Sequence, residues 1–165
     1  MGGGGGRDYG KPIIERLAKV AEQSFEEAEP PKRNVFISFD HRDLGQVNLL
    51  RGQAKNESSD LEFNDYSLKA PFDSERAEYV KAGIREKIRQ SSVTLIFISD
   101  LTPESSWVDW EARESRALGK GVVCVHAGDT PPRRLPKFVD ELGLKVIPWR
   151  HSSLSKEIEY ASRQR

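Results

Sequence analysis

The chain has 165 residues, which is enough for one domain with a substantial hydrophobic core. It carries 26 basic and 26 acidic side chains, so its formal net charge is zero, and this argues against nucleic acid or an anionic membrane as the main partner. The single cysteine, Cys124, excludes a disulfide scaffold and a thiolate-rich metal site, and the histidines lack ligand spacing, so we expect no metal.

Residues 1–31 precede the main domain and differ from it in sequence pattern. Residues 1–10 are glycine-rich, and we expect a flexible tail there. In residues 11–31, apolar side chains recur at helical spacing until Pro30 and Pro31, which predicts an amphipathic helix and a linker. We expect this helix to pack on the following domain or to meet its own copy in another subunit. MGGGGG lacks the apolar centre of a signal peptide, and no run of about 18 apolar residues could span a membrane, so we expect a cytoplasmic protein.

Residues 32–165 alternate short apolar runs with stretches of helical periodicity. The apolar runs predict strands at 34–40, 61–67, 92–99, 121–127 and 144–149. The periodic stretches predict helices at 42–55, at 74–90, from Ser106 onward, within 131–143 and at 152–161.

This alternation predicts an α/β fold with an open, five-stranded parallel sheet and helices on both faces. The first, third and fourth runs are the most apolar and should be central, whereas the polar second run should lie on an edge. The expected strand order is therefore 2-1-3-4-5. In such sheets ligands bind beyond the carboxyl ends of the strands, near the switch point between strands 1 and 3. Residues just after Asp40 and Ser99 should border the site.

Several chemistries that use this architecture are excluded. The turn after the first strand, SFDHRDLGQ, has one glycine, so it is no dinucleotide phosphate loop, and no Walker loop is present. A phosphate-accepting receiver domain needs a lysine after its fifth strand, where this chain has Pro148 and Trp149. A G-x-S-x-G nucleophile elbow is also missing.

A site that handles a ribose remains, and it centres on the helix in SSWVDWEARESRALGKG. Trp107 and Glu111 are four residues apart and share one helix face. Ser106 is a suitable N-cap and Asp109 can complete a capping arrangement, so Asp109 has a structural explanation that Glu111 lacks. The spacing W-x-x-x-E alone is weak, because most such pairs are structural.

Four blocks follow one another in a characteristic order: FISFDHRD, the DYS segment with its proline loop, SSVTLIFIS, and SSWVDWE followed by GKG. Together they resemble TIR-like domains, in particular the bacterial TIR-like family that includes the sensor proteins of Thoeris anti-phage systems. The resemblance covers Lys32 to Tyr160. It implies a flavodoxin-like fold and, as in many members, cleavage of NAD+ between nicotinamide and ribose. Thoeris sensors make a cyclic ADP-ribose isomer as a signal.

The resemblance also implies a catalytic residue. The family's glutamate lies on the helix after strand 3, one turn beyond a tryptophan, and here that position is Glu111. NAD+ is then the substrate, and no separate cofactor is expected. Its nicotinamide is already cationic and leaves as a neutral ring, so one carboxylate that holds the ribose and stabilises an oxocarbenium-like transition state is sufficient. Phe39 and Trp107 are candidate aromatic walls.

Further candidates for substrate binding lie at the strand ends. Asp40 is explained equally well as the cap of the next helix. The alternative for Ser38 is a residue that simply faces a helix, and the alternative for Asp100 is a pocket lining without a chemical role. We expect the Glu111 carboxylate to line an open cavity at this edge of the sheet.

Two other functions stay open. One is a non-catalytic TIR-type module that signals by self-assembly, and the other is an enzyme like the nucleoside deoxyribosyltransferases, with the glutamate as a covalent nucleophile. For the NAD+-cleaving enzyme we expect self-association and a phage-derived activator as partners.

Overall fold

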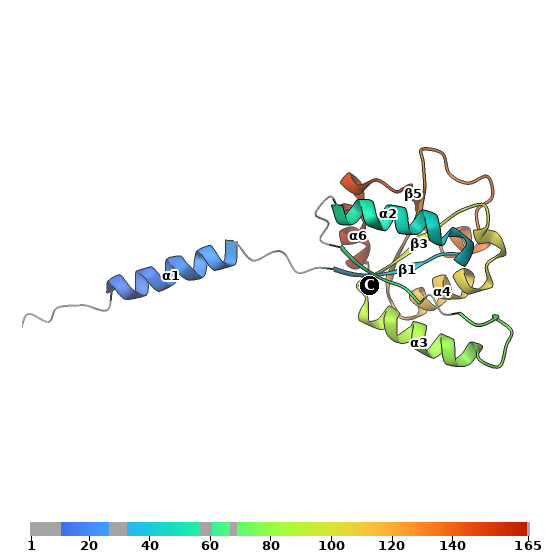
Figure 1. Cartoon of the computed structure of the whole chain (residues 1–165), viewed down its shortest axis with the longest axis horizontal. Helices are drawn as coiled ribbons and strands as arrows, with labels where there is room; N and C mark the ends of the chain where they lie inside the picture. The colour runs from blue at the N-terminus through green and yellow to red at the C-terminus, as the bar shows by residue number, and fades with distance from the viewer. Residues whose placement is uncertain (1–10, 27–32, 57–60, 67–68, 165) are drawn as a thin grey trace, which may run out of the picture. The chain divides into compact units, whose positions relative to one another are not determined.

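The computed structural model describes residues 11–26, 33–56, 61–66 and 69–164 (Figure 1). Contacts divide the chain into two units, Met1–Pro31 and Lys32–Arg165, and each is described by itself. The tail expected at 1–10, and residues 27–31 of the helix and linker expected at 11–31, lie outside the described residues.

The first unit contains helix α1 (Lys11–Glu26), as the periodicity predicted. Its apolar side chains are well exposed: Ile13, Ile14, Leu17 and Val20 each present more than half of their surface to solvent.

The second unit is built on a parallel sheet of order β2-β1-β3-β4-β5, which confirms the predicted topology. The strands are β1 (Arg33–Ser38), β2 (Leu61–Asn64), β3 (Val93–Phe97), β4 (Gly121–His126) and β5 (Val146–Pro148). The α-helices are α2 (Leu44–Asn56), α3 (Ala77–Gln90), α4 (Ser106–Ala117), α5 (Lys137–Glu141) and α6 (His151–Ser162). Two short 3₁₀ helices follow strand ends, η1 (His41–Asp43) after β1 and η2 (Thr102–Glu104) after β3.

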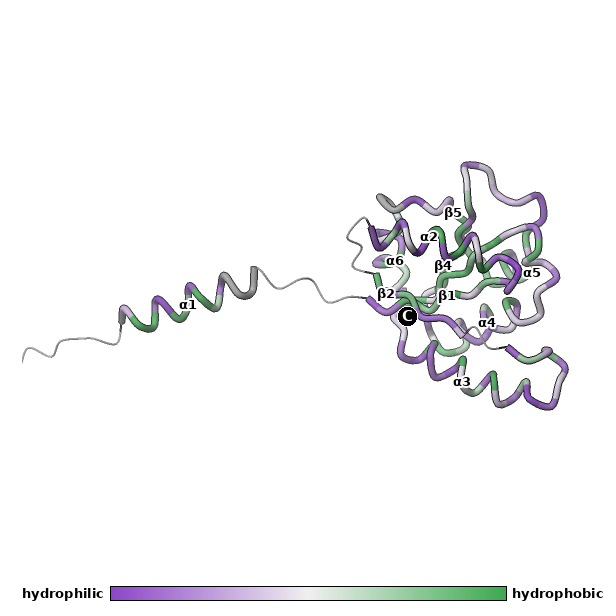
Figure 2. The backbone as a smooth tube through the Cα atoms, in the orientation of Figure 1, coloured by the Kyte–Doolittle hydropathy of each residue, from purple (hydrophilic) through white to green (hydrophobic). Residues whose placement is uncertain are grey.

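Helices cover both faces of the sheet, as expected for a sheet whose central strands are apolar throughout. On one face of the sheet, α2 and α6 pack against the β1 side chains that point to that face, which include Val35 and Ile37. On the other face α3 packs against Phe36, and α4 and α5 pack against β3 and β4. The hydrophobic colour of Figure 2 is accordingly concentrated on the central strands.

The alternation along β1 decides which residues can reach the site. Successive side chains of a strand point to opposite faces. Phe36 and Ser38 therefore face α3 and α4, whereas Val35, Ile37 and then Phe39 belong to the core under α2 and α6.

A close backbone approach joins β4 to the last helix. A Cβ atom added at Gly121 would lie 2.0 Å from the carbonyl oxygen of Ala161 in α6. Only glycine allows the start of β4 to pack this tightly against the end of α6.

Candidate active site

The candidate site forms where the end of β1 meets the second turn of α4. Glu111 lies on the face of α4 that packs against the sheet, and its side chain is 0% exposed. The hydroxyl of Ser38, which is also fully buried, donates a hydrogen bond to Oε2 of Glu111. The structure thus brings together a residue of the first strand and a residue 73 positions later.

Helix α4 is positioned by its cap and by a buried polar row. Ser105, rather than the expected Ser106, is the N-cap, and its side chain accepts from the Val108 amide. Asp109 does not take part in the cap and pairs with Arg113 instead. Further along, Ser115 donates to the Glu111 carbonyl at 2.7 Å and lies 2.8 Å from the hydroxyl of Thr94 in β3. These bonds fix the rotation of α4, and therefore the direction in which Glu111 points.

Lys69 contacts the second carboxylate oxygen. Its Nζ lies 2.7 Å from Oε1 of Glu111, and its side chain is 18% exposed. At this distance the ammonium and the carboxylate form an ion pair, which lowers the pKa of Glu111 against the effect of burial. The charge of Glu111 is thus compensated by Lys69.

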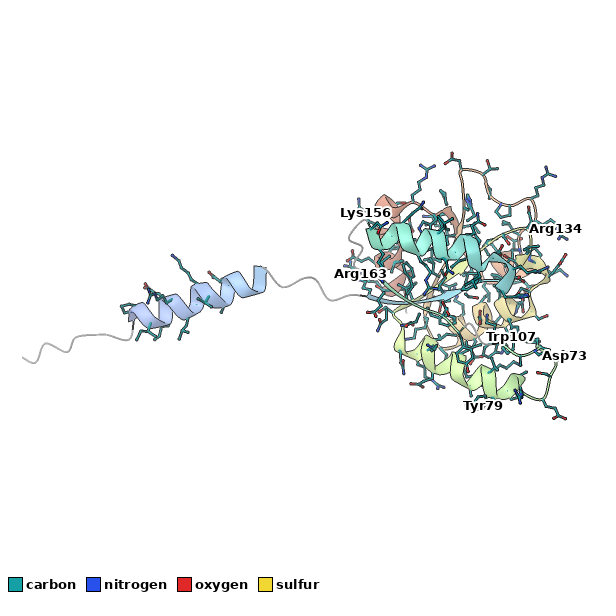
Figure 3. The ribbon with its side chains drawn as sticks, in the orientation of Figure 1. Asp73, Tyr79, Trp107, Arg134, Lys156 and Arg163 are labelled. Carbon is teal, nitrogen blue, oxygen red and sulfur yellow. The ribbon has the colours of Figure 1, made fainter. Side chains whose placement is uncertain are left out.

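Aromatic contacts hold the segment that carries Lys69, which follows the edge strand β2. The indole N–H of Trp107 donates to the Ala70 carbonyl at 2.9 Å. The rings of Phe72 and Trp107 meet edge to face, with centroids 5.0 Å apart. Lys69 Nζ is 6.0 Å from the centroid of the Trp107 ring. Trp107 and Asp73 lie at the same end of the domain in Figure 3. Residues 69–72 therefore form a cover over Glu111, which we call the Lys69 segment.

Burial dominates the electrostatics of Glu111. Desolvation raises the pKa of its carboxyl group, and the opposing effects of Lys69 and the Ser38 hydroxyl do not fully offset it. A carboxylate whose pKa is raised by burial beside a specific charged partner is a recurrent feature of functional sites, although buried structural ion pairs produce it too.

The Glu111 carboxylate, which we expected to line an open cavity, is 0% exposed in this conformation, with Lys69 in contact with it. Two cavities lined by described residues lie at this end of the sheet, and Glu111 is not in the wall of either. One of about 790 Å³ lies between the start of α4 and α5, with Phe72 and Asp109 in its wall. Another of about 330 Å³ lies at the ends of β3 and β4, with Asp100 and His126 in its wall.

Of the residues predicted for substrate binding, Ser38 and Trp107 lie beside Glu111 or its cover, and three others do not. Phe39 packs into the core on the opposite face of the sheet, so it cannot form a wall beside Glu111. Asp40 caps η1 through the Arg42 amide at 3.0 Å and pairs with the Arg42 guanidinium at 2.8 Å. That guanidinium lowers the pKa of Asp40. Asp100 accepts a hydrogen bond from the Arg133 amide at 3.1 Å.

Sequence reasoning missed Lys69 and the link between the ends of β1 and β3. The Ser99 hydroxyl donates to Asp43 at 2.6 Å, and burial raises the pKa of that carboxyl. Asp43 lies in the first turn of a helix, where the helix dipole favours an acid, so the sequence pattern does not single it out. Lys69 lies in an irregular loop, where no periodicity indicates the direction of a side chain.

Neither a metal centre nor a membrane helix is found in the described part of the chain. Its histidine, cysteine, aspartate and glutamate side chains do not gather in threes around a point that could hold a metal ion. Over the same ranges, no helix is both long and apolar enough to cross a bilayer.

Residues 36–131, more than half of the chain, match the family model described as "Thoeris protein ThsB, TIR-like domain". The chain belongs to this TIR-like family. The match includes the end of β1, the Lys69 segment and α4, so Ser38, Lys69 and Glu111 all lie within the TIR-like domain.

Comparisons with individual proteins give one relative by sequence and two structural neighbours. The TIR-like chain is 30% identical over 118 residues to a protein of Cytobacillus dafuensis named "Putative cyclic ADP-D-ribose synthase TIR2". The match covers 70% of this chain but only 31% of that relative's length. Among solved structures, a 2-deoxyribosyltransferase from Bacillus psychrosaccharolyticus aligns with a TM-score of 0.52 at 16% identity, over 73% of this chain and 89% of that one, which shows the shared fold. The TIR domains of the activated Roq1 resistosome align with a TM-score of 0.42 at 17% identity, over 78% of this chain and 68% of that one.

Proposed function

We propose that this TIR-like chain is an enzyme that splits NAD+ between nicotinamide and ribose, with Glu111 as its catalytic residue and a cyclic ADP-ribose as its signalling product in anti-phage defence. The observation that carries the proposal is a fully buried carboxylate at the strand ends, with the Ser38 hydroxyl on one oxygen and the Lys69 ammonium beside the other. The name of the Cytobacillus dafuensis relative supports the choice of NAD+.

The reaction needs little besides this carboxylate. The bond between C1′ of the ribose and the ring nitrogen breaks, and both electrons go to that nitrogen, so the cationic nicotinamide leaves as a neutral molecule without a proton from a general acid. The positive charge that develops on the ribose is stabilised by the ionised Glu111 in a site that excludes water. A nucleophilic atom of the same molecule then attacks C1′ and closes a cyclic product. Attack by water releases a proton and gives linear ADP-ribose.

The substrate can reach Glu111 only after the Lys69 segment moves, because no part of the Glu111 side chain is exposed. Replacement of Lys69 by the substrate beside Glu111 leaves the local charge balance unchanged. Lys69 presents one positive charge to Oε1, and the nicotinamide ring of NAD+ brings one positive charge in its place. Trp107, released from Ala70 and Phe72, then has an indole face available for the cationic ring. A factor made during phage infection is the cue that we expect to favour the open form.

A second candidate is a non-catalytic module that signals by self-assembly. The closed site favours it, since the ion pair with Lys69 and the hydrogen bond from Ser38 give Glu111 a structural role.

One experiment separates the two candidates. Purified protein is incubated with NAD+ and free nicotinamide is measured by chromatography for four proteins: wild type, Glu111→Gln, Lys69→Met and the double variant. Glu114→Gln is the matched control, because Glu114 lies on the same helix and forms its own ion pair with Arg85 at 2.7 Å. We expect release by the Glu114 control at the wild-type level and about tenfold more release by Lys69→Met. The two proteins that lack Glu111 should release none. The absence of release from every protein would overturn the enzymatic proposal in favour of the module.

A further inference from the structure

A second cavity of the TIR-like domain lies beyond the carboxyl ends of β3 and β4. It measures about 330 Å³, and Glu111 is not in its wall. The wall includes Gln46 of α2, the helix on the sheet face opposite α4, so the cavity is distinct from the Glu111 site. Open parallel sheets commonly bind ligands beyond the carboxyl ends of their strands. The bonding of the side chains in the wall decides whether this cavity can hold one.

His126, the last residue of β4, brings a buried nitrogen without a partner to this cavity. The residue lies in the wall and is 3% exposed. Its Nδ1 lies 3.0 Å from the carbonyl oxygen of Ala127, and because a carbonyl oxygen can only accept, Nδ1 carries the proton in this contact. Nε2 has no hydrogen-bond partner among the described residues, yet it is not one of the side-chain atoms sealed from solvent. In the neutral ring, Nε2 is therefore an acceptor that meets solvent at the cavity.

Two charged side chains in the same wall also lack ionic partners. The carboxylate of Asp100 accepts the amide N–H of Arg133 at 3.1 Å, and within the described ranges neither this carboxylate nor the Arg133 guanidinium forms an ion pair. The same hydrogen bond ties the loop after β3 to the loop after β4. An exposed ion without a partner is ordinary. Two such ions beside a buried imidazole nitrogen are a convergent set of polar groups, which is typical of a ligand pocket.

The chemistry of these three side chains defines the class of ligand. Nε2 of His126 and the second oxygen of Asp100 are acceptors, so they fit hydroxyl groups, and a carboxylate is a common partner of ribose hydroxyls. The guanidinium of Arg133 fits a phosphate, which it can bind through two parallel N–H donors. The cavity is at the small end of the range for ligand pockets, about 300–1,000 Å³, so it suits a sugar phosphate better than a whole dinucleotide.

We propose that this cavity is a binding site for a ribose phosphate, with Asp100 and His126 on the sugar hydroxyls and Arg133 on the phosphate. The role that the sequence indicated for Asp100, contact with a ribose, then belongs to a sugar other than the one beside Glu111. The site binds its ligand without a chemical step, so the proposal holds whether or not the chain cleaves NAD+.

Isothermal titration calorimetry of the full chain with ribose 5-phosphate tests the site. Arg133→Ala removes the guanidinium but keeps the amide that Asp100 accepts, and Asp100→Asn removes the charge but keeps an oxygen for that amide. Both residues are exposed, so thermal unfolding should stay at the wild-type temperature. We expect wild type to bind with a Kd of about 1 mM or tighter and each variant to bind at least tenfold more weakly. Glu111→Gln should bind as wild type does.

Matched control variants lie close to the cavity. Arg134→Ala changes the neighbouring arginine, which lines the larger cavity, and Asp129→Asn changes an acid that pairs with Arg150; neither residue is in this wall. Both controls should bind as wild type does, whereas ribose alone and inorganic phosphate alone should bind wild type at least tenfold more weakly. The proposal is overturned by the absence of binding to wild type, by equal affinities for ribose 5-phosphate and phosphate, by equal losses in variants and controls, or by loss of binding in Glu111→Gln.

Discussion

The ammonium group of Lys69 lies 2.7 Å from Oε1 of Glu111 and joins the loop after the edge strand to the helix after the third strand. The carboxylate is wholly buried, so the lysine compensates a charge that water cannot reach. Loss of one partner of such a pair commonly costs about 3–5 kcal/mol when the other stays buried. Opening of the Lys69 segment avoids that cost, because it returns Glu111 to solvent.

Lys69→Met should therefore favour the open site. The methionine keeps most of the apolar stem but removes the charge, so the closed form holds an uncompensated carboxylate. We expect nicotinamide release from NAD+ to rise by about tenfold or more, equivalent to about 1.4 kcal/mol in the closing equilibrium. Lys145→Gln is the control, since it breaks an exposed pair with Glu157. An unchanged or lower rate in Lys69→Met would show that the lysine does not restrain the site.

Trp107→Phe should loosen the same segment by a smaller amount. The change removes the indole N–H that donates to Ala70 but keeps an aromatic ring against Phe72. A lost hydrogen bond of about 1 kcal/mol predicts hydrogen exchange about fivefold faster in the Lys69 segment. Trp110→Phe makes the same change three positions further along α4 and should leave exchange in this segment as in wild type. Equal protection in the two variants would contradict the assigned anchor.

The raised pKa of Glu111 predicts a specific pH dependence of stability. Between the ordinary carboxyl value of 4.5 and the raised native value, the folded protein binds more protons than the unfolded chain, so the free energy of unfolding falls as the pH rises. Glu111→Gln removes this contribution. Urea unfolding of both proteins from about pH 4 to pH 8 should show the stability of wild type falling relative to the variant as the pH increases. A difference that stays flat, or that rises with pH, would contradict the burial of an ionisable Glu111.

The substitution Asp40→Asn distinguishes a role of Asp40 as a helix cap from a role in substrate binding. Arg42 lowers the pKa of Asp40, so the stabilisation by this pair is present above the ordinary value of 3.8 and is lost as the pH falls through the lowered value. The asparagine retains the capping oxygen without the charge, and we expect a loss of about 1 kcal/mol or less at neutral pH that disappears in acid. The KM for NAD+ should stay at the wild-type value. A large rise in KM without a change in stability would place Asp40 in the substrate site.

The fold could be predicted because its determinants are local. Uniformly apolar runs indicated the central strands, and the polar run at residues 61–67 indicated the edge, so the order of the sheet followed. The ends of elements were less accurate: β2 stops at Asn64 and β5 begins at Val146. Strand ends depend on the neighbouring strands with which they pair, and those partners are distant in the sequence.

The site was predicted only in part, for two physical reasons. The pairing of Ser38 and Phe39 as neighbours of Glu111 ignored the alternation of a strand, which sends adjacent side chains to opposite faces. The Lys69 contact depends on the path of an irregular loop and on its anchor at Trp107, so it required the tertiary structure. Glu111 itself was singled out because no capping or dipole argument explained it.

The contact between Gly121 and the Ala161 main chain has a practical consequence for anyone shortening this protein. A truncation before Ala161 removes the main-chain atoms that pack against Gly121, the first residue of β4. It also removes Ala161 from the hydrophobic core. Expression trials of trimmed versions should therefore keep α6 whole, and an affinity tag placed after it needs a spacer.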